Sequence, residues 1–431
     1  MKSSPIDIDR EDLLDRFCRY CRIDTQADEN AAQYPSSKGQ LELGQLLVRE
    51  LQEFGLTEVQ QNRFGIVTAT IPESKGNLGS ADPKSGSSRE IPVIALLAHL
   101  DTSPETSGKD VHPQIHRSYG GQPIVLPGNP DKILDPQFYP ELLSCINKTV
   151  ITTDGTTLLG ADNKAGVAVI MQFTRTILAH PEIAHGPIRI CFTCDEEIGH
   201  GVDHVDIPAL GAVAAYTLDG AGAGEIEAET FSADKASITI RGVNIHPSVA
   251  KDKMVNAIRL CGYFLSKLPQ NELSPETTSG RAGFIHPYTI EGGVAEVKMQ
   301  FLLRDFATQK LRDQETLLRN ISAELMAEYP KASIQIQITE QYRNMAEKMN
   351  QEPRAVRYAA DALRKLGLNP IIGSVRGGTD GSQLTAKGLP TPNLSTGEHN
   401  PHSPLEWTCL EEMECAVQGL IALAQRWAEP D

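Results

Sequence analysis

Apolar residues recur at helical spacing in two stretches near the start of the chain, residues 9–22 and 39–54. This spacing puts them on one face of a helix, and Gly55 is typical of a residue that ends one. A third helix is predicted over 166–178. Between these helices lie short runs that are apolar throughout. Because they do not alternate with polar residues, they predict a mostly parallel sheet covered by helices on both faces. The runs cover residues 66–71, 91–98, 149–153, 188–193 and 212–218.

The pattern changes after about residue 230, where apolar and polar residues alternate as in strands that expose one face. Such strands and two further helices predict a small α+β domain with an antiparallel sheet. The α/β pattern returns after residue 344. We therefore predict a first, discontinuous α/β domain over 1–230 and 340–431, with the second domain, 231–339, inserted into it. The strands of the inserted part are expected at 236–241, 294–301 and 333–339, its helices at 255–268 and 308–328, and the returning elements at 353–366, 370–375 and 409–428.

Acidic residues outnumber basic ones, 56 to 40, which gives a formal net charge of −16. Such a charge argues against nucleic acid or an anionic membrane as the main partner. The first residues lack the apolar core of a signal peptide, and no apolar run is long enough to span a bilayer. The sequence therefore predicts a cytoplasmic protein. The stretch 73–90, rich in Gly, Ser, Pro and charged residues, is expected to be a surface loop.

The eight cysteines do not form the spacing of a structural zinc site. Cys18 and Cys21, like Cys191 and Cys194, are separated by two residues, but neither pair has a matching second pair. We therefore expect the cysteines to be reduced and buried in the core.

Asp195, Glu196 and Glu197 stand side by side directly after the strand expected at 188–193. Neighbouring carboxylates repel and raise one another's pKa. The sequence therefore predicts either a cation beside them or an acid that carries protons. His99 and Asp101 follow another expected strand, where residues two apart share a face. A metal-binding histidine is commonly oriented by a carboxylate on its other ring nitrogen, although a satisfied structural histidine is an equal alternative here.

Further candidate ligands stand near the ends of other expected strands. Asp162 lies in a glycine-flanked turn before a helix, where a helix cap is the alternative, and Asp219 follows a buried run. His399 and His402 lie in a downstream loop. Loops at the carboxyl ends of parallel strands would assemble a His/carboxylate cluster suited to zinc or a related ion. Two metals need about six ligand positions, with one bridging carboxylate. His200 and His204 have helical spacing but lack the glutamate of the helical zinc motif.

Eight segments together resemble the peptidase T family of tripeptide aminopeptidases, within the larger group of co-catalytic zinc exopeptidases that includes aminoacylases and carboxypeptidase G. They occur in the family's order and span nearly the whole chain. The segments are AHLDTSPETSGK, TTDGTTLLGADNKAG, CDEEIGHG, YTLDGAGAGEIE, NIHPSVAK, FLLRDF, VRGGTDGSQL and PNLSTGEHNPHSPLEW.

The resemblance implies a role for each matching residue around two zinc ions, for which cobalt or manganese are possible substitutes. One ion would be held by His99, Asp162 and Asp219. The other would be held by Asp162, which bridges, together with Glu197 and His402. Asp101 would orient His99, Glu196 would be the general base, and Asp195 would be a turn or solvent residue.

The resemblance also implies a catalytic domain with an inserted lid, whose residues meet a small peptide substrate. His246 would stabilise the oxyanion, and Arg376 would contact the substrate carboxylate. Arg304 would approach the substrate, with a salt bridge on the sheet surface as the equal alternative. The expected protein is a monomer or homodimer.

The stretch around His402, HNPHSPLEW, departs from the aromatic and basic residues usual in the family. A related di-zinc hydrolase acting on a dipeptide, an N-acyl amino acid or a C-terminal peptide bond is therefore an alternative. A non-catalytic peptide- or metal-binding protein is a further one.

Overall fold

The computed structural model describes residues 6–74 and 90–430, which form two compact units. The first unit takes in the described residues of Met1–Ala228, Lys348–Gly373 and Thr379–Asp431. The second consists of Glu229–Glu347 and Ser374–Gly378. The surface loop expected at 73–90 lies, apart from its ends, outside the described residues.

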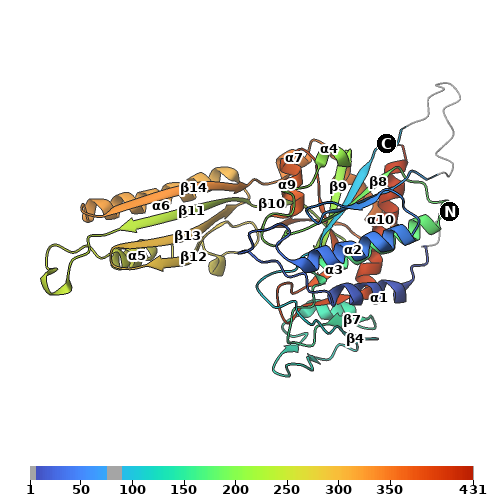
Figure 1. Ribbon diagram of the computed structural model, residues 1–431, viewed down its shortest axis with the longest axis horizontal. Helices are drawn as coiled ribbons and strands as arrows, with labels where there is room; N and C mark the ends of the chain where they lie inside the picture. Colours follow the sequence, from blue (N-terminus) through green and yellow to red (C-terminus); the bar gives the residue numbers. More distant parts are fainter. Residues whose placement is uncertain (1–5, 75–89, 431) are drawn as a thin grey trace. The chain divides into compact units, whose positions relative to one another are not determined.

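The first unit is built on one large mixed sheet, drawn with its helices in Figure 1. Its centre consists of four neighbouring strands that run parallel, in the order β8, β3, β9, β16. Antiparallel strands extend the sheet on both sides of this centre. The central strands are β8 (Ile188–Thr193), β3 (Ile94–His99), β9 (Ala214–Ala221) and β16 (Asn393–His399); the flanking ones are β1 (Val59–Gln61), β2 (Val67–Ile71), β17 (Trp407–Cys409), β7 (Val150–Thr152) and β4 (Gln114–His116).

The central strands β3 and β8 are almost wholly buried, which explains why they are mostly apolar. In β3, Leu96 and Ala98 join one hydrophobic core, while Ala95 and Leu97 join another on the opposite face. The first core is formed with α1 (Arg10–Cys21), α2 (Lys38–Glu53), α3 (Ala161–Ala179), α8 (Arg354–Lys365) and α10 (Leu410–Ala428). The second includes apolar residues of α4 (Ile207–Leu210) and α9 (Asp380–Ala386).

Short elements complete the first unit. A helical turn of the 3-10 type, η1 (Pro140–Cys145), and the hairpin of β5 (Ile124–Val125) and β6 (Ile133–Leu134) pack beside β7 and β17 around a small core of their own. β10 (Glu225–Thr230) pairs with β16 and with β15 (Ile371–Val375). β10, β15 and α7 (Ala346–Met349) each contain residues of both units.

The second unit has a four-stranded antiparallel sheet in the order β12, β13, β11, β14. These strands are β12 (Phe284–Gly292), β13 (Glu296–Asp305), β11 (Ser232–Arg241) and β14 (Ser333–Tyr342). Two helices, α5 (Ala257–Ser266) and α6 (Thr308–Glu328), share one hydrophobic core with it, and the short turns η2 (Pro247–Val249) and η3 (Pro275–Thr277) link the elements. The mixed sheet with its helices and the separate antiparallel sheet confirm the predicted fold class.

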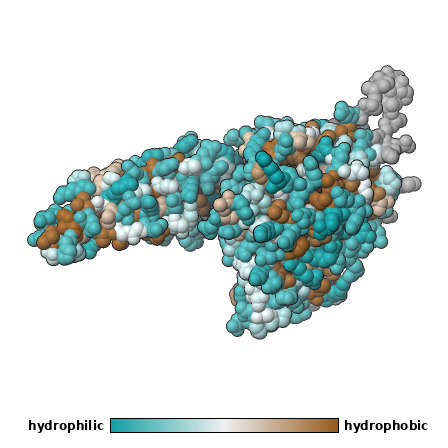
Figure 2. All heavy atoms as spheres, viewed as in Figure 1, coloured by the Kyte–Doolittle hydropathy of each residue, from teal (hydrophilic) through white to brown (hydrophobic). Residues whose placement is uncertain are grey.

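β12 and β16 are among the strands that the hydrophobic pattern did not predict. β12 is an edge strand with most of its residues exposed and a proline at position 287, a residue that sheets accept mainly at their edges. β16 reads Asn-Leu-Ser-Thr-Gly-Glu-His and was expected to be a loop, yet most of it is buried in the sheet. Hydrophilic residues make up much of the visible surface of each unit (Figure 2), as the charge predicts. In the described part of the chain, no helix has both the length and the apolar character needed to cross a membrane.

Gly166 allows α3 to approach β9 closely. A Cβ atom added there would lie 1.9 Å from the carbonyl oxygen of Leu218 and 2.2 Å from Oδ1 of Asn163. We predict that Gly166→Ala lowers the free energy of unfolding by at least 1–3 kcal/mol, roughly the usual cost of overpacking. Gly419→Ala, in α10, is the matched control, because its Cβ would meet only a side chain at 3.9 Å. It should be neutral or stabilising by about 0.5–1 kcal/mol. Thermal denaturation of both variants measures the difference, and equal melting temperatures would contradict the packing argument.

Candidate metal centre

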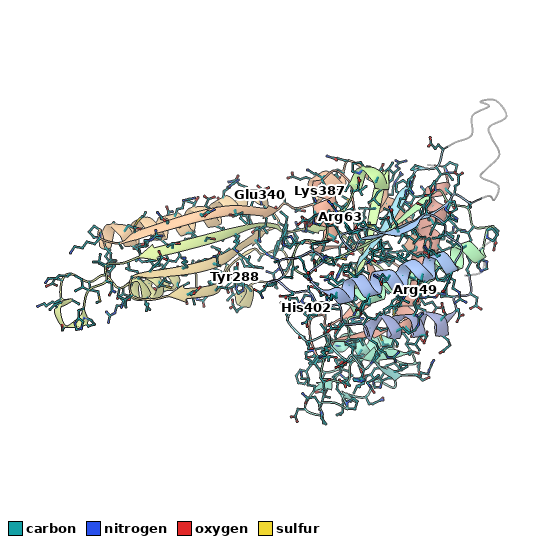
Figure 3. All side chains as sticks on the ribbon, viewed as in Figure 1. Arg49, Arg63, Tyr288, Glu340, Lys387 and His402 are labelled. Atoms are coloured by element: carbon teal, nitrogen blue, oxygen red, sulfur yellow. The ribbon has the colours of Figure 1, made fainter. Side chains whose placement is uncertain are left out.

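The carboxyl ends of the four central parallel strands bring polar side chains to one edge of the sheet. His99 is the last residue of β3, Glu196 and Glu197 follow β8, and Asp219 lies near the end of β9. His402 follows β16 by three residues and is labelled in Figure 3. Open α/β sheets place their sites at this edge, because each strand delivers a loop to the same place.

Asp162 lies between the two histidines and presents a different oxygen to each. Its Oδ1 is 3.0 Å from Nε2 of His99, and its Oδ2 is 3.2 Å from Nε2 of His402. The same nitrogen of His99 is 3.4 Å from Oδ1 of Asp219, and that of His402 is 2.9 Å from Oε2 of Glu197. Nε2 of each imidazole therefore faces two carboxylates, and the two groups share Asp162.

The position of Asp162 is fixed by the chain around it. Gly160 precedes α3 with φ of 80°, and Asp162 has non-helical dihedral angles in the first turn. The buried carboxylate of Glu406 accepts hydrogen bonds from the backbone N–H groups of Leu159, Gly160 and Asp162, at 2.7, 2.8 and 3.0 Å. Glu406 thereby holds the turn that presents Asp162.

Asp101 connects the first histidine with the acidic turn. Its Oδ1 lies 3.4 Å from Nδ1 of His99, the nitrogen that faces away from Asp162. Its two carboxylate oxygens also accept the backbone N–H groups of Glu196 and Glu197, at 3.1 and 3.0 Å. The backbone carbonyl oxygen of Asp101 lies 3.2 Å from the same Nδ1, so Asp101 orients the imidazole with two oxygens while its side chain fixes the backbone of both glutamates.

The residue before them, Asp195, is a turn residue with φ of 61°, but it is not a solvent residue as expected. Its side chain is buried and accepts hydrogen bonds from Ser36 and from Nε2 of Gln40. Asp195 therefore points away from Glu196 and Glu197, toward the start of α2.

Glu196 has its own support from a second glycine-flanked acid, Asp380. The backbone N–H of Asp380 donates to Oε1 of Glu196 at 3.2 Å. The carboxylate of Asp380 is buried and accepts from Oγ1 of Thr193 at 2.7 Å. Glu196 therefore has a fixed direction, and among the described residues it forms no ion pair with His99 or His402.

The carboxylates of the cluster raise the pKa values of its two histidines. Burial opposes protonation of His99, but Asp219, Asp101 and Asp162 outweigh it and raise its pKa well above the usual value. Burial opposes protonation of His402 as well, but hydrogen bonds to Asp162 and Glu197 raise its pKa to about 11. Hydrogen bonds from His402 and His99 overcome the effect of burial on Asp162 and hold its pKa below the usual range.

The remaining acids show the opposite shift. Burial, followed by the charge of Asp162, raises the pKa of Glu197 to about 8. Burial raises the pKa of Asp219 to about 6 and that of Asp380 to about 7. Burial also raises the pKa of Glu196 well above its usual value, with the charge of Asp380 adding to the effect. The cluster therefore holds more negative charge than its two imidazoles balance.

This donor set fits divalent metal ions. Imidazole nitrogens and carboxylate oxygens are the ligands that zinc and related ions take. Ligand atoms of His99, Asp162 and Glu197 lie within 4.8 Å of one another. Oε1 of Glu197 is buried and has no hydrogen-bond partner among the described residues, so it is free for a cation. Asp162, with one oxygen toward each histidine, has the geometry of a bridging ligand.

Glu398 is a member of the cluster that the sequence did not reveal. A carboxylate oxygen of Glu398 lies within 4.8 Å of oxygens of Asp162 and Asp219. Its Oε1 accepts a hydrogen bond from Oγ1 of Thr396, and burial followed by the charge of Asp219 raises its pKa well above the usual value. Asp380 was missed too, although its glycine-flanked setting repeats that of Asp162.

Three other histidines lie outside the cluster. His399 stacks on Trp407 with ring centroids 3.7 Å apart, and its Nε2 is 2.8 Å from Oε2 of Glu412. His200 contacts Asp203, and His204 stacks on the ring of Phe64. The helical spacing of His200 and His204 is therefore not a metal motif here.

His246, Arg304 and Arg376 belong to the second unit. His246 is exposed and its Nδ1 contacts Oγ of Ser248 at 2.7 Å. Arg304 lies over the ring of Tyr342, and its Nε is buried without a partner among the described residues.

Arg376 is already engaged. Its guanidinium donates to the carbonyl oxygens of Thr278 and Ala282 and to Oγ1 of Thr278, at 2.8–2.9 Å. It also lies 5.5 Å from the centres of two phenylalanine rings. In this structure Arg376 therefore serves as an internal clamp of the second unit.

The site and fold can be compared with known proteins. Residues 228–333 match a family model described as a peptidase dimerisation domain. Peptidase T of Listeria welshimeri is 43% identical over 422 residues, which cover 98% of this chain and 100% of that protein. Peptidase T of Shouchella clausii is 43% identical over 420 residues, with coverage of 97% and 99%.

Solved structures share the fold at lower identity. The aminopeptidase PepT of Bacillus cereus has a TM-score of 0.72 at 22% identity and covers 98% of this chain and 100% of its own. A tripeptidase of Staphylococcus aureus has a TM-score of 0.73 at 22% identity, with coverage of 98% and 99%. A dinuclear metal-binding M20 peptidase of Bacillus subtilis reaches 0.64 at 16%, with coverage of 96% and 97%.

The shared fold agrees with the arrangement of the cluster at the edge of the sheet. Sequence identity above 40% that extends over nearly all of both chains goes further than a shared fold. This chain belongs to the peptidase T family of M20 peptidases.

Proposed function

We propose that the protein is a metal-dependent aminopeptidase that removes the N-terminal residue from tripeptides. The observation that supports this most directly is the placement of Asp162 between His99 and His402, with one oxygen toward each. Its near neighbour, the Glu196–Glu197 pair, supplies an acid for metal binding and another for proton transfer. The family supplies the substrate class, since its curated relatives carry the name peptidase T.

In this proposal two zinc ions are held, and cobalt or manganese could replace them. His99, Asp162 and Asp219 would hold one ion. Glu197 and His402 would hold the other together with Asp162. When bound, such ions lower the pKa of water and polarise a carbonyl group.

The residues of the chain divide the remaining work. Glu196, held by the N–H of Asp380, would take a proton from the attacking water and deliver it to the leaving amine. Asp101 would fix the positions of His99 and of the acidic turn relative to each other. A base that is fixed at both ends loses little freedom when substrate binds.

Residues of the second unit are proposed to meet the peptide. His246 would stabilise the developing oxyanion with a ring N–H. Arg304, whose Nε lacks a partner among the described residues, is suited to a carboxylate. Arg376 could contact the substrate carboxylate only by exchanging its bonds to Thr278 and Ala282. The match of residues 228–333 to a dimerisation domain supports a homodimer.

The substrate class is tested by hydrolysis of a free tripeptide by the purified protein. We predict release of the N-terminal residue, with little action on dipeptides or longer peptides. A chelator should abolish the activity, and added zinc or cobalt should restore it. N-acylated and C-amidated peptides complete the panel. If only N-acylated compounds were hydrolysed, the tripeptidase proposal would be wrong, and the same site would act on a different substrate class.

Glu196→Gln tests the base while preserving the shape of the side chain. We predict that both metals remain and that kcat falls by about 10²–10⁴-fold, because the amide cannot accept the proton. Glu182→Gln is the control, since Glu182 is a surface acid, 70% exposed, paired with His180. Near-normal turnover of Glu196→Gln would eliminate Glu196 as the base.

His402→Ala tests the second group of ligands. We predict that it loses one equivalent of metal, measured by elemental analysis, and most of its activity. His200→Ala is the matched control, because the His200 side chain is exposed and its Nδ1 contacts the carboxylate of Asp203. A full metal content in His402→Ala would show that His402 is not a ligand.

A further inference from the structure

Two cysteines and a glutamate from distant parts of the chain converge in the first unit, away from the histidines of the metal centre. Cys145 ends η1, Cys409 ends β17, and Glu412 lies in the first turn of α10. Both cysteines are fully buried, and Glu412 is 6% exposed. One ligand atom of each residue lies within 4.8 Å of the other two. The cluster is therefore compact and shielded from water.

The carboxylate of Glu412 is held in a defined direction. Its Oε1 lies 3.8 Å from Sγ of Cys145, and its Oε2 is 2.8 Å from Nε2 of His399. His399 is itself fixed by stacking on Trp407. A carboxylate with one oxygen bonded to an oriented imidazole leaves the other oxygen directed at the thiols.

The site is separate from the metal centre although the same strand supplies both. Successive residues of a strand point to opposite faces. Glu398 contributes to the group around Asp162 and Asp219, whereas the next residue, His399, contacts Glu412. The two sites thus lie on opposite sides of β16.

Core packing alone accounts for a single buried cysteine, but it does not account for this combination. A buried carboxylate is costly unless a charge or several hydrogen bonds compensate it. His399 compensates one oxygen of Glu412, but thiols are weak donors and do little to compensate the other. Two sulfur ligands and one oxygen ligand are, in contrast, a suitable set for a soft or borderline divalent ion.

We propose that Cys145, Cys409 and Glu412 bind a soft divalent cation such as Zn²⁺ or Cd²⁺, with His399 orienting the glutamate. Tetrahedral zinc bonds of about 2.0–2.3 Å place ligand atoms roughly 3.3–3.8 Å apart. The atoms here already lie within 4.8 Å of one another, so a small contraction would bring these three ligands to bonding distance of one ion. The ion would join η1, β17 and α10, three segments that are distant in the sequence.

The test uses the full-length protein, stripped of metal and titrated with Co²⁺. Thiolate bound to cobalt gives an intense charge-transfer absorption in the near ultraviolet, which a site of imidazole and carboxylate ligands cannot give. We expect this absorption to appear with one equivalent of Co²⁺ beyond those of the di-metal centre. Added Cd²⁺ should displace that equivalent first and remove the band. This readout does not depend on catalytic activity.

Variants identify the residues that give the thiolate-to-cobalt absorption. Cys145→Ser with Cys409→Ser should abolish the band and lose one equivalent of metal, and Glu412→Gln should weaken cobalt binding at this site. Cys18→Ser, a buried cysteine of α1, is the matched control and should keep the band. His402→Ala should keep it as well, because His402 belongs to the other group.

Three results would overturn the proposal. The first is a wild-type protein that shows no thiolate-to-cobalt band at saturating Co²⁺, whatever the behaviour of the variants. The second is a loss of both thiols to a disulfide in the protein as purified, shown by mass spectrometry before and after reduction, with no metal bound after reduction. A band that persists in the double cysteine variant would also exclude this site.

Discussion

The structure depends on keeping several carboxylates together in a buried place. Glu196, Glu197, Asp162 and Asp219 would repel one another if nothing positive stood between them. Two imidazoles supply part of the positive charge, and Nε2 of each one faces two carboxylates. The raised pKa of Glu197, near 8, shows that the compensation is incomplete. Bound cations would complete the compensation of this negative charge, and they would also make the cluster catalytically competent.

The cluster holds its shape because other buried acids act on the backbone and not on the cluster itself. Glu406 binds three N–H groups at the start of α3, and Asp101 binds two in the acidic turn. Asp195 is turned away toward Ser36. Backbone N–H groups are neutral donors that compensate a carboxylate without competing for a metal. The chain thus uses one set of acids for position and leaves another set for ligands.

Hydrophobic pattern predicted the fold well where burial is apolar and failed where it is polar. The run in β3 packs against both cores, so its two-sided apolar character was a direct signal. β16 is equally buried but carries Ser, Thr and Glu, because it lines the cluster, and it was read as a loop. Glu406, Glu398 and Asp380 were missed for a related reason. Their importance lies in contacts with segments more than a hundred residues away, or with ligands that only the fold brings near. The roles of His99, Asp101 and the other assigned residues stay predictions, although the fold brings those of the first unit together.

β16 shows how closely position and chemistry are linked in this fold. Its place beside β9 puts Glu398 among the acids of the metal centre, and the pleat then forces His399 to the other side. There His399 meets Glu412, in the first turn of the helix that follows β17. A register shift of one residue would exchange the two side chains and disrupt both environments at once. The antiparallel pairing of Glu398 with Thr408 and of His399 with Trp407 opposes such a shift, and the stacked Trp407 ring reinforces it. The loop that begins at the end of this strand carries His402, so the same pairing also sets where the second histidine of the cluster can lie.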